Sequence, residues 1–156
     1  MASGITATDE CVSIYETLKL NQSLSIYGGY VDTKTKGPIY NTKTTDGIQV
    51  NRIFFVSWIP EGMKVKPKMT YASAREPFKQ QLGNGLSYVI QATNYDDINE
   101  EGIGKIVGVK KFKFEINIKE YFTENDGGYF VFDSKQMIIY RIKDEKIVVD
   151  QIITSL

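Results

Sequence analysis

The sequence predicts an α/β fold: a single domain, spanning residues 1–156, built on a mixed β-sheet with helices on both faces. Two apolar runs rich in β-forming residues, Arg52–Trp58 and Ser87–Gln91, each predict a strand. The segment between them, Lys66–Leu82, has the patterning of an amphipathic helix. A strand, a helix and a strand joined by short links form a βαβ unit, so we expect parallel strands and a right-handed crossover.

Proline and glycine set the expected ends of that helix. Pro67 falls in its first turn, where the missing N–H of proline is tolerated, and Gly83 to Gly85 supply the conformational freedom needed at its end. Pro77 would lie inside the helix, where it removes a hydrogen bond. We therefore expect a kink or an early end at Pro77.

The N-terminal segment predicts an arm followed by a helix. Met1–Ala7 is small and polar, which is typical of a mobile arm. Thr8 can cap the helix that follows. Cys11, Tyr15 and Leu18 recur at helical spacing, so we expect them in the core.

Four further segments have their own patterns. Ser23–Val31 predicts a strand interrupted by two glycines. The acidic stretch Asn94–Glu101 favours a solvated loop or short helix over a calcium loop, because it lacks the alternating ligand spacing. Lys111–Ile118 alternates strictly between apolar and polar residues and predicts a half-buried strand. Glu120–Glu124 predicts a helical turn.

The C-terminal third predicts three strands, at Tyr129–Phe132, Met137–Ile142 and Lys146–Ile152. The last two are separated by Lys143, Asp144 and Glu145, so they predict a hairpin.

Composition excludes several classes of function. The chain has 19 basic and 19 acidic residues, so its bulk charge predicts neither a nucleic-acid nor a membrane partner. It has no histidine and one cysteine, which removes histidine-based catalysis and thiolate zinc sites. No apolar run approaches the roughly 18 residues of a membrane span. We expect a monomer that is no enzyme and holds no metal or cofactor.

Three segments resemble the actin-depolymerising factor/cofilin family. They are Trp58 to Glu61 (WIPE), Val65 to Ser73 (VKPKMTYAS) and Tyr88 to Thr93 (YVIQAT). The N-terminal residues Met1 to Ile5 (MASGI) are also similar to the family's first residues. The resemblance implies the fold of that family's homology domain. It also implies a cytoplasmic, cytoskeleton-associated protein that binds actin monomers, and in a further role filaments, and promotes depolymerisation.

By the same resemblance, an arm, a loop and the long helix would contact actin. The implied contact residues are Ser3, Gly4, Ile5, Arg52, Lys66, Lys68, Met69 and Arg75. The basic side chains would pair with acidic groups of actin, while Met69 would pack in an apolar cleft. Ser3 matches the family's phosphorylation site, where a phosphate would repel an acidic surface.

The C-terminal third resembles the same family in a different order. Glu124–Asp133 is similar to an early strand of the family and Met137–Gln151 to its first hairpin, yet both come last here. We interpret this as a rearranged segment order, natural or engineered; the alternative is accidental similarity. In the family, a basic residue is usual at the position of Val50, and a basic C-terminal helix belongs to the surface that contacts the filament. This sequence has valine at that position and shows no such helix, so the resemblance supports monomer binding more than filament severing.

Two other functions stay open. One is a scaffold or engineered variant that keeps the fold without actin activity. The other is a module that binds phosphoinositides through the lysines of the long helix.

Overall fold

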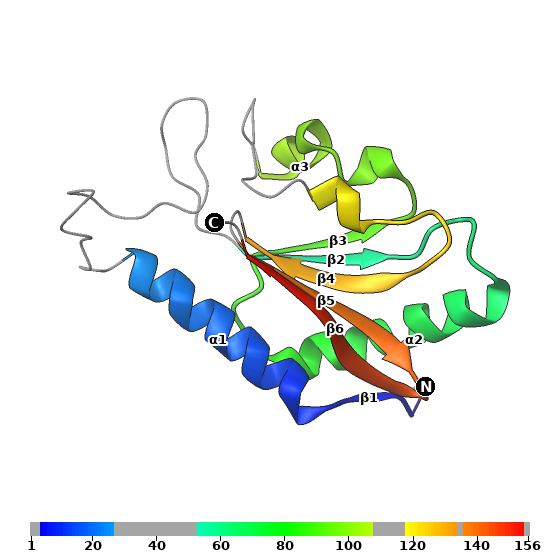
Figure 1. Cartoon of the computed structure of the whole chain (residues 1–156). Helices are drawn as coiled ribbons and strands as arrows, with labels where there is room; N and C mark the ends of the chain where they lie inside the picture. The colour runs from blue at the N-terminus through cyan, green and yellow to red at the C-terminus, as the bar shows by residue number, and fades with distance from the viewer. Residues whose placement is uncertain (1–3, 27–52, 108–117, 134–135, 155–156) are drawn as a thin grey trace.

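The computed structural model describes residues 4–26, 53–107, 118–133 and 136–154. Within these residues the chain forms one six-stranded sheet with the strand order β1-β6-β5-β4-β2-β3 (Figure 1). The strands are β1 (Thr6–Ala7), β2 (Phe54–Trp58), β3 (Tyr88–Ala92), β4 (Gly128–Phe132), β5 (Gln136–Lys143) and β6 (Lys146–Thr154). The helices are α1 (Asp9–Ile26), α2 (Val65–Leu82) and α3 (Glu100–Val107), with 3₁₀ turns η1 (Tyr95–Asp97) and η2 (Ile118–Tyr121).

The predicted βαβ unit is confirmed. Strands β2 and β3 pair in parallel, with Phe55 opposite Val89, and α2 connects them. On its other side β2 pairs antiparallel with β4, which pairs antiparallel with β5. The hairpin of β5 and β6 is also confirmed, and β1 pairs in parallel with β6. The predicted mixed α/β architecture is therefore correct.

The C-terminal hairpin lies in the same sheet as β2, with β4 between them. A hairpin moved from an early to a late place in the chain would need such a position, because each strand must keep its neighbours. The adjacency agrees with the rearranged order, and the relocation itself stays a prediction.

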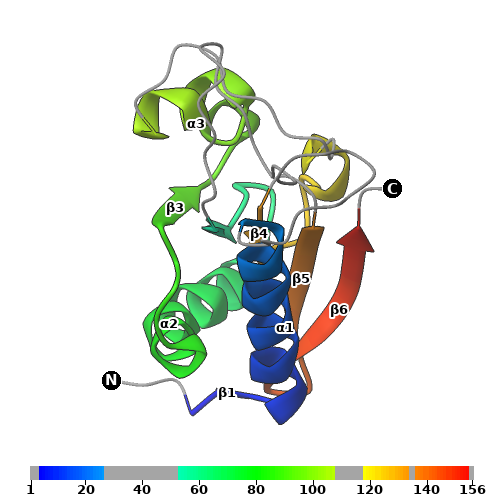
Figure 2. The same ribbon diagram turned by 90° about the vertical axis from the view of Figure 1, so that its left-hand side faces the viewer.

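Helices α1 and α2 cover one face of the sheet (Figures 1 and 2). The residues that the helices bury there are Cys11, Tyr15, Leu18, Tyr71, Ala74, Phe78 and Leu82. They pack on alternate residues of the strands, among them Phe55, Tyr129 and Val131. The predicted core positions of the first helix are confirmed, and Tyr71 of α2 is also buried.

The other face is covered by α3 and the two 3₁₀ turns (Figure 2). Its core includes Trp58, together with Ile98, which directly follows η1, and Ile103 of α3. The Trp58 indole N–H donates to the Thr123 carbonyl at 2.7 Å, which satisfies its one polar group. The expectation of helices on both faces is correct.

Three expectations for local structure are wrong. Ser23–Val31 is not a strand where it is described, because α1 continues through Ile26. No glycine or proline interrupts the helix before Gly28, and each further residue adds a hydrogen bond once a helix is nucleated. The expectation of a mobile arm over Met1–Ala7 is also wrong for Thr6 and Ala7, because these two residues pair with β6. Finally, the early end considered at Pro77 is wrong, because α2 continues to Leu82, the end predicted for the whole helix.

Other expectations are shifted or untested. The turn expected at Glu120–Glu124 is found as η2, which begins at Ile118. The remainder of the strand predicted at Lys111–Ile118 lies outside the described residues. None of the described helices combines the length and the apolar character that crossing a membrane requires.

Candidate functional site

The start of α2 combines basic and apolar side chains on the surface. The chain leaves β2 at Trp58 and turns at Pro60, whose carbonyl accepts a hydrogen bond from the Met63 N–H at 3.1 Å. Lys64 is the N-cap residue and makes no side-chain capping bond. The first turn of α2 contains no acidic residue.

Lys64, Lys66 and Lys68 form what we call the basic helix start. The N-terminus of a helix carries partial positive charge, so lysines there are unfavourable by about 0.3–1 kcal/mol each. Within the described part of the chain, none of these ammonium groups is paired with a carboxylate. The positive charge of these lysines is therefore not neutralised by a carboxylate, although it lies at the N-terminus of α2, where the helix dipole makes positive charge unfavourable. Such a local conflict is typical of a binding site.

Two large apolar side chains lie beside these lysines. Val65 is 71% exposed and Met69 is 66% exposed. Four residues apart, they are neighbours on one face of α2. Tyr71, by contrast, points into the molecule and is 6% exposed. The structure thus places Met69 and Lys66 outward together, as a contact surface requires.

Arg75 lies differently from the lysines. Its side chain is half-buried, and its Nε atom is buried with no hydrogen-bond partner among the described residues. It is close enough to Tyr129 to influence that phenol: burial raises the pKa of Tyr129 far above its ordinary value, and the positive charge of Arg75 acts in the opposite sense. Only part of the guanidinium is therefore available to a partner.

The described part of the N-terminal arm, residues 4–7, is held against the same helix. The Gln81 amide accepts from the Ala7 N–H at 3.3 Å and donates to the Ala7 carbonyl at 3.2 Å. Gly4 has a φ of 80°, which favours glycine, and Ile5 packs against the core. Ile5 and Lys66 line one surface hollow, so the arm and the start of α2 are adjacent.

That hollow, which we call the arm hollow, has a volume of about 530 Å³. It lies between the arm, the first two turns of α2 and the turn that joins β5 to β6. Its lining residues are Ile5, Lys66, Pro67, Thr70, Tyr71, Ile142, Asp144 and Glu145. The contribution of the β5–β6 turn was not foreseen, because residues so distant in sequence give no signal of their adjacency.

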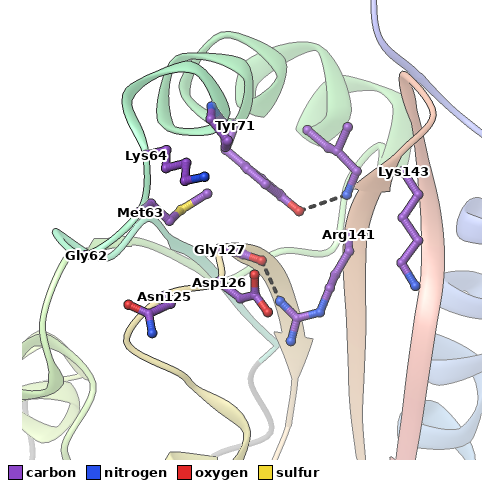
Figure 3. Close-up of a pocket in the computed structure, with 11 residues that line it drawn as sticks. Gly62, Met63, Lys64, Tyr71, Asn125, Asp126, Gly127, Arg141 and Lys143 are labelled. Carbon is purple, nitrogen blue, oxygen red and sulfur yellow. Dashed lines mark hydrogen bonds between the residues drawn. The ribbon is translucent and has the colours of Figure 1, made fainter.

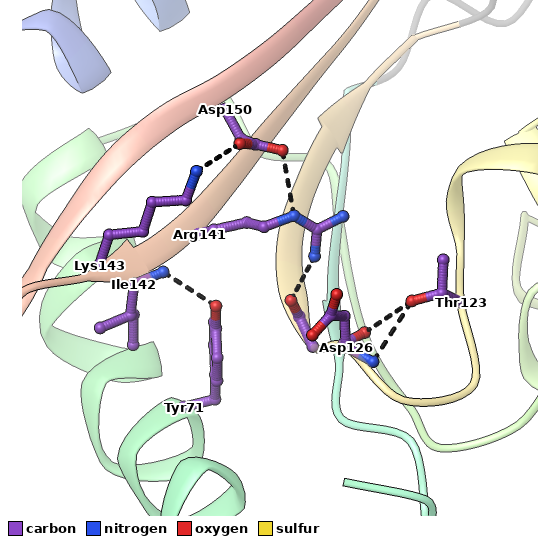
Figure 4. Close-up of polar contacts among 8 residues, drawn as sticks. Tyr71, Thr123, Asp126, Arg141, Ile142, Lys143 and Asp150 are labelled. Carbon is purple, nitrogen blue, oxygen red and sulfur yellow. Dashed lines mark hydrogen bonds and ion pairs between the residues drawn. The ribbon is translucent and has the colours of Figure 1, made fainter.

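A second hollow, of about 620 Å³, shares Tyr71 and Ile142 with the arm hollow as lining residues (Figure 3). Lys64, Arg141 and Lys143 contribute to its lining. Arg141 is already engaged: it donates to the Gly127 carbonyl and, through Nε, to Asp150 at 3.1 Å. Lys143 donates to the same carboxylate at 2.9 Å (Figure 4). These cations serve mainly to hold β5, β6 and the loop before β4 together.

Two of the expected contact residues cannot be placed. Ser3 and Arg52 lie outside the described residues. Gly4, Ile5, Lys66, Lys68, Met69 and Arg75 are described, and the structure brings Gly4, Ile5, Lys66, Lys68 and Met69 to the region around the start of α2.

The described residues offer a surface for binding and little for catalysis. Cys11 is buried, donates to the Ile147 carbonyl at 3.2 Å, and burial raises the pKa of its thiol. Among the described residues no three His, Cys, Asp or Glu side chains are grouped to hold a metal ion. The acidic stretch is used in capping instead: the Asp97 carboxylate accepts from the Thr93 N–H at 3.0 Å.

Comparison with known proteins gives consistent matches. A sequence model described as cofilin/tropomyosin-type actin-binding protein matches residues 38–108, which include β2, α2, β3 and α3. A cofilin of Gibberella zeae is 41% identical over 68 residues, which are 44% of this chain and 43% of that protein. A cofilin of Mycosarcoma maydis is 26% identical over 131 residues, covering 66% of this chain and 94% of that protein. Actophorin of Acanthamoeba castellanii is 29% identical over 131 residues, with the same coverage. The chain spans less than half the length of the Gibberella cofilin, and the same holds for actin-depolymerizing factors of Zea mays and Arabidopsis thaliana that are 42% and 35% identical to it.

Proposed function

We propose that the chain is a member of the family of cofilin/tropomyosin-type actin-binding proteins, whose model matches residues 38–108. As such a member it would bind actin monomers, and also filaments, and promote their depolymerisation. It would act by binding, without catalysis, in the cytoplasm at the actin cytoskeleton. The relatives named cofilin, actophorin and actin-depolymerizing factor support this assignment.

One observation carries the proposal: the uncompensated lysines of the basic helix start surround the exposed pair Val65 and Met69. An apolar pair that becomes buried on binding can supply most of the affinity, on the order of 1.5–3 kcal/mol for each side chain. Exposed charge pairs contribute about 0–1 kcal/mol each, so the lysines would mainly steer and orient an acidic partner surface. We assign Lys66, Lys68 and Met69 to the centre of the interface, with Gly4 and Ile5 at its edge.

The remaining assignments depend on the resemblance more than on the structure. Arg75 would contribute through the exposed part of its guanidinium. Arg52 would extend the contact to a neighbouring subunit of a filament, and Ser3 would bring negative charge to the interface when phosphorylated. Phosphoinositides are a second candidate ligand of the same lysines.

The experiment reverses the charge at the centre of the interface. In the double variant Lys66→Glu/Lys68→Glu we expect loss of monomer binding and of filament co-sedimentation, with an unchanged unfolding midpoint. The matched control is Lys105→Glu, on α3 across the sheet, which should bind like the wild type. Unchanged binding in the double variant would refute the assigned surface.

Two assays separate the alternative functions. A scaffold without actin activity would leave the fluorescence of pyrene-labelled filaments unchanged at high protein concentration. A phosphoinositide module would pellet with phosphoinositide-containing liposomes, and that pelleting would persist in a Met69→Ala variant that no longer binds actin.

A further inference from the structure

The arm hollow has an apolar floor and charges of opposite sign on its two sides. Ile5, Pro67 and Ile142 contribute apolar surface, as does the ring of Tyr71. Lys66 lies on the α2 side, whereas Asp144 and Glu145 lie on the side of the β5–β6 turn. A partner group that fills the hollow would therefore meet all three kinds of surface at once.

The two carboxylates of the turn are not used within the described part of the chain. Asp144 and Glu145 are exposed, and neither takes part in a hydrogen bond or ion pair with another described residue. Asp150, on β6 nearby, shows the contrast, because it pairs with both Arg141 and Lys143. Asp150 thus pairs with both cations of β5. The negative charge of Asp144 and Glu145 therefore remains available to a binding partner.

The turn formed by Asp144 and Glu145 does not have the residues that would make it most stable. Asp144 has a φ of 52° and Glu145 a φ of 63°, both in the left-handed region. Two-residue hairpin turns of this kind favour Asn followed by Gly, since glycine adopts positive φ without steric cost. The chain therefore places a glutamate, at some cost in stability, where it adds charge to the rim of the arm hollow.

We propose that the arm hollow is a second contact region for actin, which receives an apolar side chain of the partner with a basic side chain next to it. The apolar group would rest on Ile5 and Ile142, and the basic group would face Asp144 and Glu145. This inference rests on the proposed function and extends it, because it adds acidic side chains to an interface whose other charged side chains are basic. A partner surface of alternating charge is more selectively bound than a uniformly acidic one.

The test removes the charge and keeps the turn. The double variant Asp144→Asn/Glu145→Gly should unfold at the same or a higher denaturant concentration than the wild type, and should bind actin monomers about three- to tenfold more weakly. The difference should shrink as salt is raised, because exposed charges are screened. A loss of affinity together with a gain of stability cannot come from a structural role of these carboxylates.

The matched control removes two carboxylates from α3 and η1, on the other face of the sheet: Asp96→Asn/Glu101→Gln has the same net charge and should bind like the wild type. If the wild type binds and the turn variant binds equally well or more tightly, this inference is overturned and the proposed function stands. If the wild type does not bind actin at all, both are overturned.

Discussion

The Tyr71 hydroxyl accepts a hydrogen bond from the backbone N–H of Ile142 at 2.8 Å, which ties α2 to β5 (Figure 4). The same tyrosine accepts a second bond at its carbonyl from the Tyr129 hydroxyl. Tyr71 therefore fixes both the distance of α2 from the sheet and its rotation. Because Met69 is two residues earlier on the helix, its outward direction follows from the inward direction of Tyr71.

Tyr71→Phe should lower the free energy of unfolding by about 1–3 kcal/mol, because the Ile142 N–H loses its acceptor in a partly buried place. Urea unfolding followed by circular dichroism measures the change. Tyr88→Phe is the control, since the Tyr88 ring stacks on Phe54 and its hydroxyl makes no hydrogen bond to a described residue. Equal stability of the two variants would show that the bond to Ile142 contributes nothing.

Met69→Ala should weaken actin binding by about ten- to a hundredfold, the loss expected when a buried methionine contact of roughly 1.5–3 kcal/mol is removed from an interface. The free energy of unfolding should not change, because Met69 is 66% exposed. Titration of labelled actin monomers gives the affinity. Leu20→Ala is the matched control: Leu20 is 59% exposed on α1. Equal affinity for both variants would remove Met69 from the interface.

The central part of the fold was predictable from local signals. The βαβ unit follows from two apolar runs and a helix bounded by Pro67 and Gly83, and Gly83 has the positive φ of 89° that favours glycine. The β5–β6 hairpin follows from two β-rich runs separated by a polar turn. In these segments propensity, pattern and turn residues agree, which is why sequence reasoning succeeds there.

The rest of the fold was not predictable locally, because it depends on contacts between residues that are far apart in the sequence. Thr6 and Ala7 form a strand only because β6 offers an unpaired edge, which no local pattern reveals. The candidate site shows the same division. The exposure of Lys66 and Met69 follows from helical geometry, whereas the arm hollow exists because β5 and β6, near the end of the chain, lie beside α2.

Pro77 is a second case in which tertiary contacts override a local preference. The proline has no N–H to donate to the Ser73 carbonyl, yet α2 continues because Phe78 and Leu82 are buried against the sheet. Pro77→Ala should therefore raise the free energy of unfolding, by about 1–3 kcal/mol, since it restores a helical hydrogen bond. Chemical denaturation measures it. A loss of stability would instead indicate that the packing of Phe78 requires the bend that a proline introduces.

Asp150 should make the free energy of unfolding depend on pH in the acidic range. The Lys143 ammonium and then the Arg141 guanidinium hold the pKa of this carboxyl below its ordinary value. A lowered folded-state pKa contributes stability that is present above the unfolded-state pKa, near 4, and is lost as the pH falls through the folded-state value. Asp150→Asn should thus be less stable than the wild type at neutral pH, and the difference should narrow as the pH falls from about 5 to about 2.

Urea unfolding at a series of pH values measures this difference. The effect should be modest, because Lys143 is largely exposed and its pairing is screened by solvent. Asp96→Asn serves as the control, since it removes an exposed carboxylate that pairs with no cation among the described residues. A stability difference between the wild type and Asp150→Asn that stays constant over the whole pH series would contradict the prediction. Once the wild-type carboxyl is protonated, neither protein has the ion pair, so the part of the difference that the ion pair causes must vanish.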